Sequence, residues 1–276
     1  MKIAVAIPTC NADAENLWQQ VLSAFADQSL QPELRLICDS ASEDDTGKIA
    51  EKAGWQVMKI SRSEFNHGLT RQRMLEVLAE QGAEVVIMAT QDAIPGSEDT
   101  LKVLVENLIS TGAAVSYARQ ISRNKGSFDH FSREKNYPPE SRLKSKADIP
   151  QLGLMTAFCS DTLAAWRVDA VMAAGGFPET EFGEDTLLAA KLLARGEKVS
   201  YCAESFCFHT HKDSIFENFH RGLAIGRMHA ANPFLGRDFG SPGVKGARQF
   251  CWRHMGCFAA KTLGFILGKA GGGKRS

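Results

Sequence analysis

Four short polar segments carry most of the side chains that could bind a ligand in the first half of the chain. They span residues 8–11, 39–42, 65–68 and 90–93, and they supply carboxylates, amides, hydroxyls and an imidazole. Such groups form hydrogen bonds with a polar ligand or coordinate a hard cation. The sequence contains neither GxGxxG nor GxxxxGKS/T, so dinucleotide enzymes of the Rossmann type and P-loop NTPases are disfavoured.

Two histidines in the second half could bind a metal ion. His209 and His211 are two residues apart in an expected strand, so both side chains point to the same face. Cys202 and Cys207 lie just before them, which leaves a zinc site as an alternative. The C-x4-C-x-H-x-H spacing matches no usual zinc finger. A zinc site that uses both cysteines is therefore weaker than a metal site that uses a histidine alone.

The polar segments need a scaffold that brings them together. Helical periodicity predicts helices over 16–28, 44–53, 68–81 and 98–110, and short apolar runs predict strands over 3–7, 34–38, 57–60, 85–89 and 113–118. This alternation predicts an α/β fold with a mostly parallel central sheet and helices on both faces. Ligands of such sheets bind outside the carboxyl ends of the strands, where the polar segments fall.

The second half is less regular. Residues 122–150 are polar and contain prolines, which is typical of a lid, a binding loop or a disordered segment. Ser214 and Glu217 form the pattern of a capping box, which predicts a helix from 214 to about 231. We also predict helices over 168–174 and 184–195, and strands over 154–160, 198–203 and 205–209.

Composition indicates a folded, reduced protein. The 276 residues are 44% hydrophobic, and 32 basic residues balance 32 acidic ones, which gives no argument for nucleic-acid binding. The seven cysteines include no CxxC pair, which favours free thiols in the cytoplasm. We expect no signal peptide, because a proline interrupts the first apolar run, and no spanning helix, because no run of about 18 apolar residues occurs.

Six motifs in order give the chain its family resemblance. They are Ile7-Pro8-Thr9 with Asn11, the segment 39–44, the segment 65–71, Thr90-Gln91-Asp92-Ala93, the segment 175–179, and Gly183-Glu184-Asp185. Over about residues 3–230 the chain resembles the inverting glycosyltransferase family 2 with the GT-A fold, within its bacterial rhamnosyltransferase-like branch. The resemblance implies that a sugar is moved from a nucleoside diphosphate to an acceptor hydroxyl.

The resemblance also implies a catalytic base. Sugar transfer needs a base that deprotonates the acceptor hydroxyl, and Asp185 matches the Asp of the family's Glu-Asp motif. At the first turn of a helix the dipole favours an ionised carboxylate, although Glu184 and Asp185 could also simply cap that helix. We expect Glu184 and Trp166 to contact the acceptor.

The donor site is implied in the same way, and we expect the nucleotide sugar to contact Pro8, Thr9, Asn11, Asp39, His67, Arg71, Gln91 and Asp92. Asp39 would accept the N3–H of a uracil or thymine ring, although it could also form an Asx turn. His67 and Arg71 would bind the diphosphate at a helix N-terminus, and a solvated helix start is the alternative for His67.

A divalent cation is the expected cofactor. Asp92 resembles the last Asp of the family's DxD motif, which holds Mg²⁺ or Mn²⁺ against the diphosphate. One of His209 and His211, for which we choose His209, resembles the C-terminal His that can complete the metal site or touch the diphosphate. Thr90 and Gln91 replace the other positions of the motif, so a single carboxylate remains. That departure weakens the expectation of a metal more than the expectation of transfer.

The resemblance implies transfer of rhamnose from dTDP-rhamnose, with inversion, to a hydroxyl of a cell-surface polysaccharide or a lipid-linked glycan. One alternative is a UDP-sugar transferase of the same fold. Another is a catalytically silent protein that binds nucleotide sugars, which the single carboxylate in Thr90-Gln91-Asp92 keeps open.

The chain divides into three regions. Residues 1–121 form the nucleotide-sugar-binding half, residues 122–235 the acceptor-binding and catalytic half of the same domain, and residues 236–276 a tail. From 239 onward the tail has seven basic residues and no acidic one. A helix over 250–267 would gather Cys251, Trp252, Met255, Phe258, Ala259, Leu263, Phe265 and Ile266 on one face.

Such a tail fits a peripheral position on the inner face of the cell membrane, with residues 245–276 on anionic lipid. The alternatives are that the apolar face packs on the protein's own core or forms a homodimer, and Gly256, Gly264 and Gly268 weaken the helix prediction.

Overall fold

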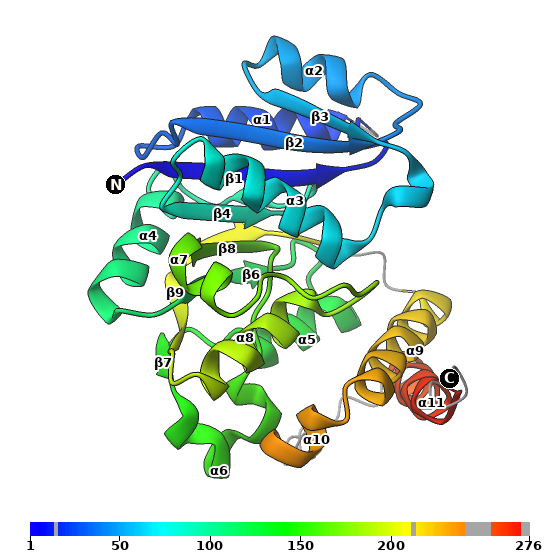
Figure 1. Cartoon of the computed structure of the whole chain (residues 1–276). Helices are drawn as coiled ribbons and strands as arrows, with labels where there is room; N and C mark the ends of the chain where they lie inside the picture. Colours follow the sequence, from blue (N-terminus) through cyan, green and yellow to red (C-terminus); the bar gives the residue numbers. More distant parts are fainter. Residues whose placement is uncertain (14–15, 211–213, 241–254, 272–276) are drawn as a thin grey trace.

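One mixed sheet runs through the protein (Figure 1). The computed structural model describes residues 1–13, 16–210, 214–240 and 255–271. The strands lie in the order β3 (Gln56–Ile60), β2 (Leu34–Ser40), β1 (Ile3–Thr9), β4 (Val85–Ala89), β8 (Leu163–Arg167), β6 (Val115–Ile121), β9 (Val199–Phe208) and β5 (Ile94–Pro95), and β7 (Arg142–Lys144) pairs with β9. Strands from both halves of the chain therefore share one sheet.

The expectation of a mostly parallel sheet holds among the first four strands and for one further pair. β1 to β4 pair in parallel, and so do β6 and β9. β8 is antiparallel to both β4 and β6, between which it lies, and β5 and β7 are antiparallel to β9. A strand from the second half is thus inserted between two strands of the first half.

Helices cover both faces of the sheet, as the buried apolar runs predicted. Side chains alternate along β1, so Ile3, Val5 and Ile7 pack on one face, against α1 (Leu17–Ala26), α2 (Thr46–Lys52) and α4 (Thr100–Thr111). Ala4 and Ala6 face the other side, where α3 (His67–Glu80), α7 (Val168–Ala173) and α8 (Glu184–Ala194) pack. The two apolar cores hold the strand ends in a fixed relation to one another.

Two strand predictions in the second half are wrong. The apolar run 154–160 is not a strand: it begins in the 3₁₀ helix η4 (Gly153–Thr156), which follows α6 (Ile149–Leu152), and β8 starts only at Leu163. The buried Lys144 ammonium donates to the carbonyls of Met155 (3.2 Å) and Phe158 (2.5 Å), which a strand pairing would need. The two short strands expected over 198–209 are one strand, β9, whose register against β6 shifts after Ala118.

The polar stretch 122–150 has more structure than expected. It contains α5 (Phe128–Asn136), β7 and the 3₁₀ helix η3 (Lys146–Asp148), and a further 3₁₀ helix, η2 (Arg62–Glu64), precedes α3. η2, β7 and η3 span three residues each, which is too short for a helical or strand period to show in the sequence.

Two C-terminal helices pack against each other at one side of the sheet domain (Figure 1). α9 (Ile215–Ala231) starts with the predicted capping box, in which Ser214 Oγ accepts from Glu217 N at 3.1 Å; α10 (Phe234–Phe239) follows, and α11 (Met255–Gly271) lies along α9. A Cβ atom at Gly226 would lie 2.1 Å from Phe265 O, and one at Gly264 would lie 2.2 Å from Phe219 O. The glycines that weakened the helix prediction form the contact surface.

The face of α11 turned away from α9 is apolar and exposed. Leu263 is 53% exposed, and Ile266 and Leu267 are similarly open. Of the expected apolar face, Cys251 and Trp252 lie outside the described residues. Within the described ranges, none of the helices has the length and apolar character needed to cross a bilayer.

Candidate active site

The carboxyl ends of β1 and β2 bring the first two polar segments together. Pro8 and Thr9 stand opposite Cys38 and Asp39 in the parallel register, and Thr9 Oγ1 donates to Cys38 O at 3.4 Å. Asn11 has a left-handed backbone (φ 47°), and its Oδ1 accepts from Glu43 N at 2.8 Å. The two strand-end loops are therefore tied to each other.

Gln91 fixes the first of these loops. Its Oε1 accepts from Cys10 N at 2.7 Å, and its Nε2 donates to Cys10 O at 3.2 Å. The side-chain amide of Gln91 therefore binds both the N–H and the carbonyl of Cys10. This places Gln91 beside the expected donor site as a residue that shapes the loop.

Asp39 forms an Asx turn, one of the two roles that the sequence predicts for it; the other is recognition of a nucleobase. Its Oδ1 accepts from Ser42 N at 3.3 Å and from the Ser42 hydroxyl, and Ala41 between them has a left-handed backbone (φ 53°). The turn holds the carboxylate at the end of β2. This arrangement is compatible with recognition of a nucleobase.

The start of α3 is attached to the segment before α8. Asn66 Oδ1 caps α3 by accepting from Leu69 N, and it also accepts from Thr180 N, both at 3.1 Å. A Cβ atom at Gly68 would lie 1.7 Å from Pro178 O, so only glycine allows this approach. Burial lowers the pKa of His67, against the opposing effect of Glu184, which keeps the imidazole neutral near pH 7.

Arg71, Glu184 and Trp166 are buried, which corrects three expectations. Arg71 is 3% exposed; its Nε donates to Glu184 Oε1 at 2.8 Å and lies 3.2 Å from Asp161 Oδ2. The guanidinium therefore faces two carboxylates instead of a diphosphate. Trp166 has no exposed surface and donates to Asp161 Oδ1 at 2.7 Å, so neither it nor Glu184 can contact an acceptor directly.

Asp185 lies at the end of this buried cluster and is itself only half-buried. Its Oδ2 accepts from Asp161 N at 3.1 Å, and its Oδ1 accepts from Thr186 N at 2.6 Å. Burial, followed by the charge of Glu184, raises the pKa of Asp185 to about 7, although both hydrogen bonds oppose this. A carboxylate with such a pKa can take a proton near neutral pH.

Asp92 and His209 meet from separate elements. His209, at the end of β9, has its Nε2 3.0 Å from Asp92 Oδ2 and its Nδ1 3.1 Å from Gln120 Oε1. A carboxylate and an imidazole fit a cation that keeps water and phosphate oxygens as its other ligands. The donor set thus suits Mg²⁺ or Mn²⁺ next to a diphosphate.

Zinc does not fit the described residues. Across the parts of the chain that the structure describes, no three His, Cys, Asp or Glu side chains are placed to share a metal. Cys202, Cys207 and His209 are among those residues, whereas His211 lies outside them. The zinc alternative therefore lacks the ligands it would need from β9.

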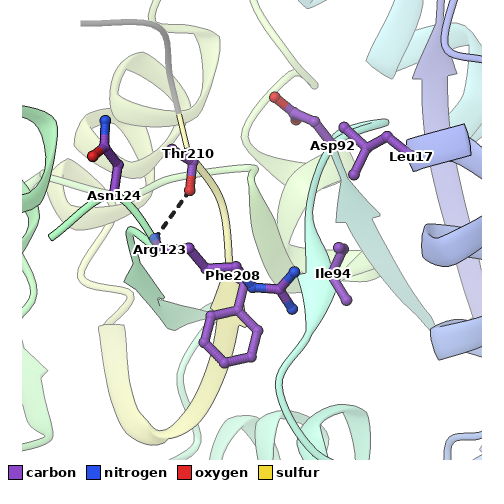
Figure 2. A pocket seen from close by; sticks show the side chains of 7 residues that line it. All are labelled: Leu17, Asp92, Ile94, Arg123, Asn124, Phe208 and Thr210. Carbon is purple, nitrogen blue, oxygen red and sulfur yellow. Dashed lines mark hydrogen bonds between the residues drawn. The ribbon is translucent and has the colours of Figure 1, made fainter. Parts of the chain in front are cut away.

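A pocket of about 390 Å³ opens beside Asp92 (Figure 2). The Arg123 side chain extends into it between Phe208 and Ile94, with the guanidinium carbon 4.3 Å from the centroid of the Phe208 ring. Arg123 N donates to Thr210 Oγ1 at 3.1 Å, which fixes the loop after β6 against the end of β9. An arginine held this way can bind an anion next to the Asp92 carboxylate.

Two residues of the site are missing from the sequence-based set. Arg123 lies two residues after β6. Ligands of such sheets bind at the carboxyl ends of the strands, so the same rule applied to the strand predicted over 113–118 would have pointed to Arg123. Asp161 precedes β8, whose start the sequence misplaced, and no pattern in the chain marks it.

A family model and two related proteins match this chain. The model of the family "Glycosyl transferase family 2" matches residues 4–174. The O-antigen chain rhamnosyltransferase RfbN of Salmonella typhimurium is 37% identical over 98% of this chain and 90% of its own length, and WbaN of Salmonella anatum is 36% identical over 95% and 88%.

A solved structure shares the fold at low sequence identity. The mannosyltransferase PcManGT from Pyrobaculum calidifontis, solved with GDP-Man and Mn²⁺, has a TM-score of 0.63 at 15% identity and covers 99% of this chain and 88% of its own. Its GT-A sheet with helices on both faces matches the architecture described above. The chain is a glycosyltransferase enzyme and belongs to glycosyl transferase family 2.

Proposed function

We propose that the protein transfers rhamnose from dTDP-rhamnose, with inversion, to a hydroxyl of a cell-surface polysaccharide or lipid-linked glycan. The names of the relatives RfbN and WbaN support the sugar and the kind of acceptor. The observation that carries the mechanism is the half-buried Asp185 carboxylate, held by two backbone N–H groups and basic near pH 7.

In this mechanism Asp185 takes the proton of the acceptor hydroxyl as the acceptor oxygen attacks the anomeric carbon of the donor. The bond from that carbon to the diphosphate breaks on the opposite side, so the configuration inverts and the nucleoside diphosphate leaves with the electron pair. Asp39 would accept from the thymine ring, and Arg123 would offset charge on the leaving diphosphate.

Asp92 and His209 would hold a Mg²⁺ or Mn²⁺ ion against that diphosphate. The ion supplies positive charge that stabilises the leaving group. The Nδ1 contact with Gln120 fixes the orientation of the His209 ring, so that Nε2 faces Asp92.

We also propose a peripheral position at the inner face of the cell membrane, through the exposed apolar residues of α11. The excess of basic residues from 239 onward supports an anionic lipid surface. A homodimer through the same face is the alternative. In this proposal residues 1–121 bind the donor, residues 122–235 supply the base, and residues 236–276 meet the membrane.

A donor screen tests the proposal. Thermal shift with dTDP-rhamnose, UDP-glucose and UDP-GlcNAc should give the largest rise in apparent melting temperature with dTDP-rhamnose, because a ligand that binds only the folded state stabilises it. Transfer to a glycan acceptor should then be found with that donor. A larger shift with a UDP sugar would favour the UDP-dependent alternative, and binding without transfer to any acceptor would favour a silent binding protein.

A further inference from the structure

Three cationic side chains from three helices come together in the second half of the chain. Arg133 lies on α5, Arg221 on α9 and Lys261 on α11. Lys261 Nζ is 6.0 Å from the centroid of the Phe128 ring, so this side chain reaches from α11 to the start of α5. A Cβ atom at Gly222 would lie 2.0 Å from Lys261 O, so Arg221 stands next to a close contact between α9 and α11.

The acidic groups nearby do not balance these charges. Asp129 Oδ2 lies 3.1 Å from Arg133 Nε, and both side chains are buried. Glu217 is exposed, and its carboxylate is used in the capping box of α9. Among the residues that the structure describes, no carboxylate forms an ion pair with Arg221 or with Lys261. These two half-buried cations therefore lack a direct counter-charge.

The surroundings of the two cations oppose their charge. Burial, followed by the charge of Arg133, lowers the pKa of Arg221. Burial, followed by the charge of Arg221, lowers the pKa of Lys261 to about 8, although Asp129 opposes this shift. Both groups are still protonated at pH 7, so the fold holds like charges together against their repulsion. A bound anion would relieve that repulsion.

The face of α9 that carries Arg221 is turned toward the segment of the proposed base. Met228 is seven residues after Arg221, which puts both side chains on one face of the helix, about 10 Å apart along its axis. Met228 packs on Gly183, two residues before Asp185: a Cβ atom at Gly183 would lie 3.2 Å from Met228 Cε. Since α9 begins shortly after His209, Arg221 lies along this helix between His209 and Gly183.

Tyr137 links the cluster to Asp185. Its backbone N–H donates to Arg133 O at 2.8 Å, at the end of α5. Burial raises the pKa of its phenol; the charge of Arg133 opposes this shift and the charge of Asp185 adds to it. The same phenol also acts on Arg221. The cationic cluster and the proposed base are therefore within electrostatic reach of one side chain.

We propose that Arg221 and Lys261 form a binding site for a phosphate group of one of the two substrates, with Arg133 adding positive charge behind them. A guanidinium can hold two phosphate oxygens at once, and an ammonium adds a compact charge. The inference depends on the proposed function only for the source of the phosphate. That source is the diphosphate of the donor or a phosphate carried by a lipid-linked acceptor.

Calorimetric titration with inorganic diphosphate, in buffer without divalent cations, tests the site. We expect Arg221→Gln and Lys261→Gln each to weaken diphosphate binding at least about tenfold, because a charge-assisted hydrogen bond is lost. Arg221→Lys keeps the charge and should weaken binding less than Arg221→Gln. Arg227→Gln is the matched control: it removes the same charge from an exposed position on α9 and should bind diphosphate like the wild-type protein.

A second titration, with dTDP present at saturating concentration, identifies the source of the phosphate. If diphosphate no longer binds, dTDP occupies the site and the phosphate belongs to the donor. We then expect Arg221→Gln to weaken dTDP binding as well. If diphosphate still binds beside dTDP, the site serves a phosphate of the acceptor, and Arg221→Gln should abolish this additional binding.

Two results would overturn the proposal. In one, Arg221→Gln binds diphosphate as tightly as the wild-type protein in both titrations. In the other, the wild-type protein binds no diphosphate. If Arg221→Gln does not fold, Lys261→Gln takes its place in the comparison. The proposed function fails separately, in the transfer assay, because neither titration involves turnover.

Discussion

At the scale of single residues, the proposed mechanism requires Asp185 to lose its proton before it acts as a base. Because its pKa is raised to about 7, transfer should fall as the pH drops below that value. Asp185→Asn should lower kcat at least about a hundredfold while donor binding is kept. Initial rates from pH 5 to 9, with donor affinity by calorimetry, check both statements. Near-normal turnover by the variant would remove Asp185 from the mechanism.

The same group links stability to pH. An acid with a pKa of 3.8 in the unfolded chain and about 7 in the folded one is protonated only in the folded state between these values. The free energy of unfolding therefore falls as the pH rises from about 4 to 7 and then stays level. Asp185→Asn has no carboxyl at this position and does not lose this stability. The difference in melting temperature, variant minus wild type, should therefore increase as the pH rises from about 4 to 7. A constant difference across the window would contradict the raised pKa.

Asp92 and His209 lead to a prediction about the metal. Asp92→Ala should weaken donor binding measured with Mn²⁺ at least about tenfold, because the diphosphate loses its bridge to the protein. Asp238→Ala, which changes an exposed carboxylate on α10, is the control and should bind normally. If a chelator leaves wild-type transfer untouched, Asp92 has some other role.

Sequence patterns located several of these residues but could not orient all of them. Asp92 and His209 each follow a strand, and the position of the strand end restricts where their side chains can lie. The fold brings the two side chains together. Arg71 stands one turn into a helix, and spacing alone does not say which flank faces Glu184 and Asp161. Burial of a guanidinium depends on those distant carboxylates, which no local pattern contains.

At the scale of elements, apolar runs predicted the strands that are buried on both faces. They failed at residues 154–160, where the backbone carbonyls of Met155 and Phe158 bind the Lys144 ammonium instead of a neighbouring strand. The pattern also could not predict that β8 is inserted antiparallel between β4 and β6, because a short apolar run does not show how a strand is oriented in the sheet. Such choices depend on contacts between residues far apart in the sequence.

The contact between α9 and α11 makes glycine necessary. Gly264→Ala should destabilise the pair by about 1–3 kcal/mol, because the new methyl group would lie 2.2 Å from Phe219 O and the helices would have to separate. Gly271→Ala is the matched control: nothing lies within 4 Å, so it should be neutral or slightly stabilising. Limited proteolysis of the C-terminal segment checks the difference, and equal cleavage of both variants would contradict it.

At the scale of the whole molecule, the exposed face of α11 is the surface through which we propose that the protein meets lipid. Replacing Leu263, Ile266 and Leu267 by Ser should abolish sedimentation with anionic liposomes, because the apolar area buried in the headgroup region is lost. Ile109→Ser with Met172→Ser removes exposed apolar groups elsewhere and should bind like wild type. Wild-type binding should weaken with salt, since the tail is basic.

Two outcomes would contradict the membrane proposal. The wild-type protein would fail to sediment with liposomes at any salt concentration, or the Ser variant would sediment as well as wild type. A concentration-dependent dimer that the same three substitutions disrupt would then assign the face to a second copy of the chain.

The double hydrogen bond of Asn66 has a consequence for local opening of the molecule. One amide oxygen holds both the first turn of α3, in the first half of the chain, and Thr180, just before the helix of Asp185. A second link, from Gly68 N to Thr180 O at 3.1 Å, ties the same two segments together. We therefore expect opening of either segment to cost the hydrogen bonds between them, so that amide hydrogen exchange at Leu69 and at Thr180 is slowed by the same contacts.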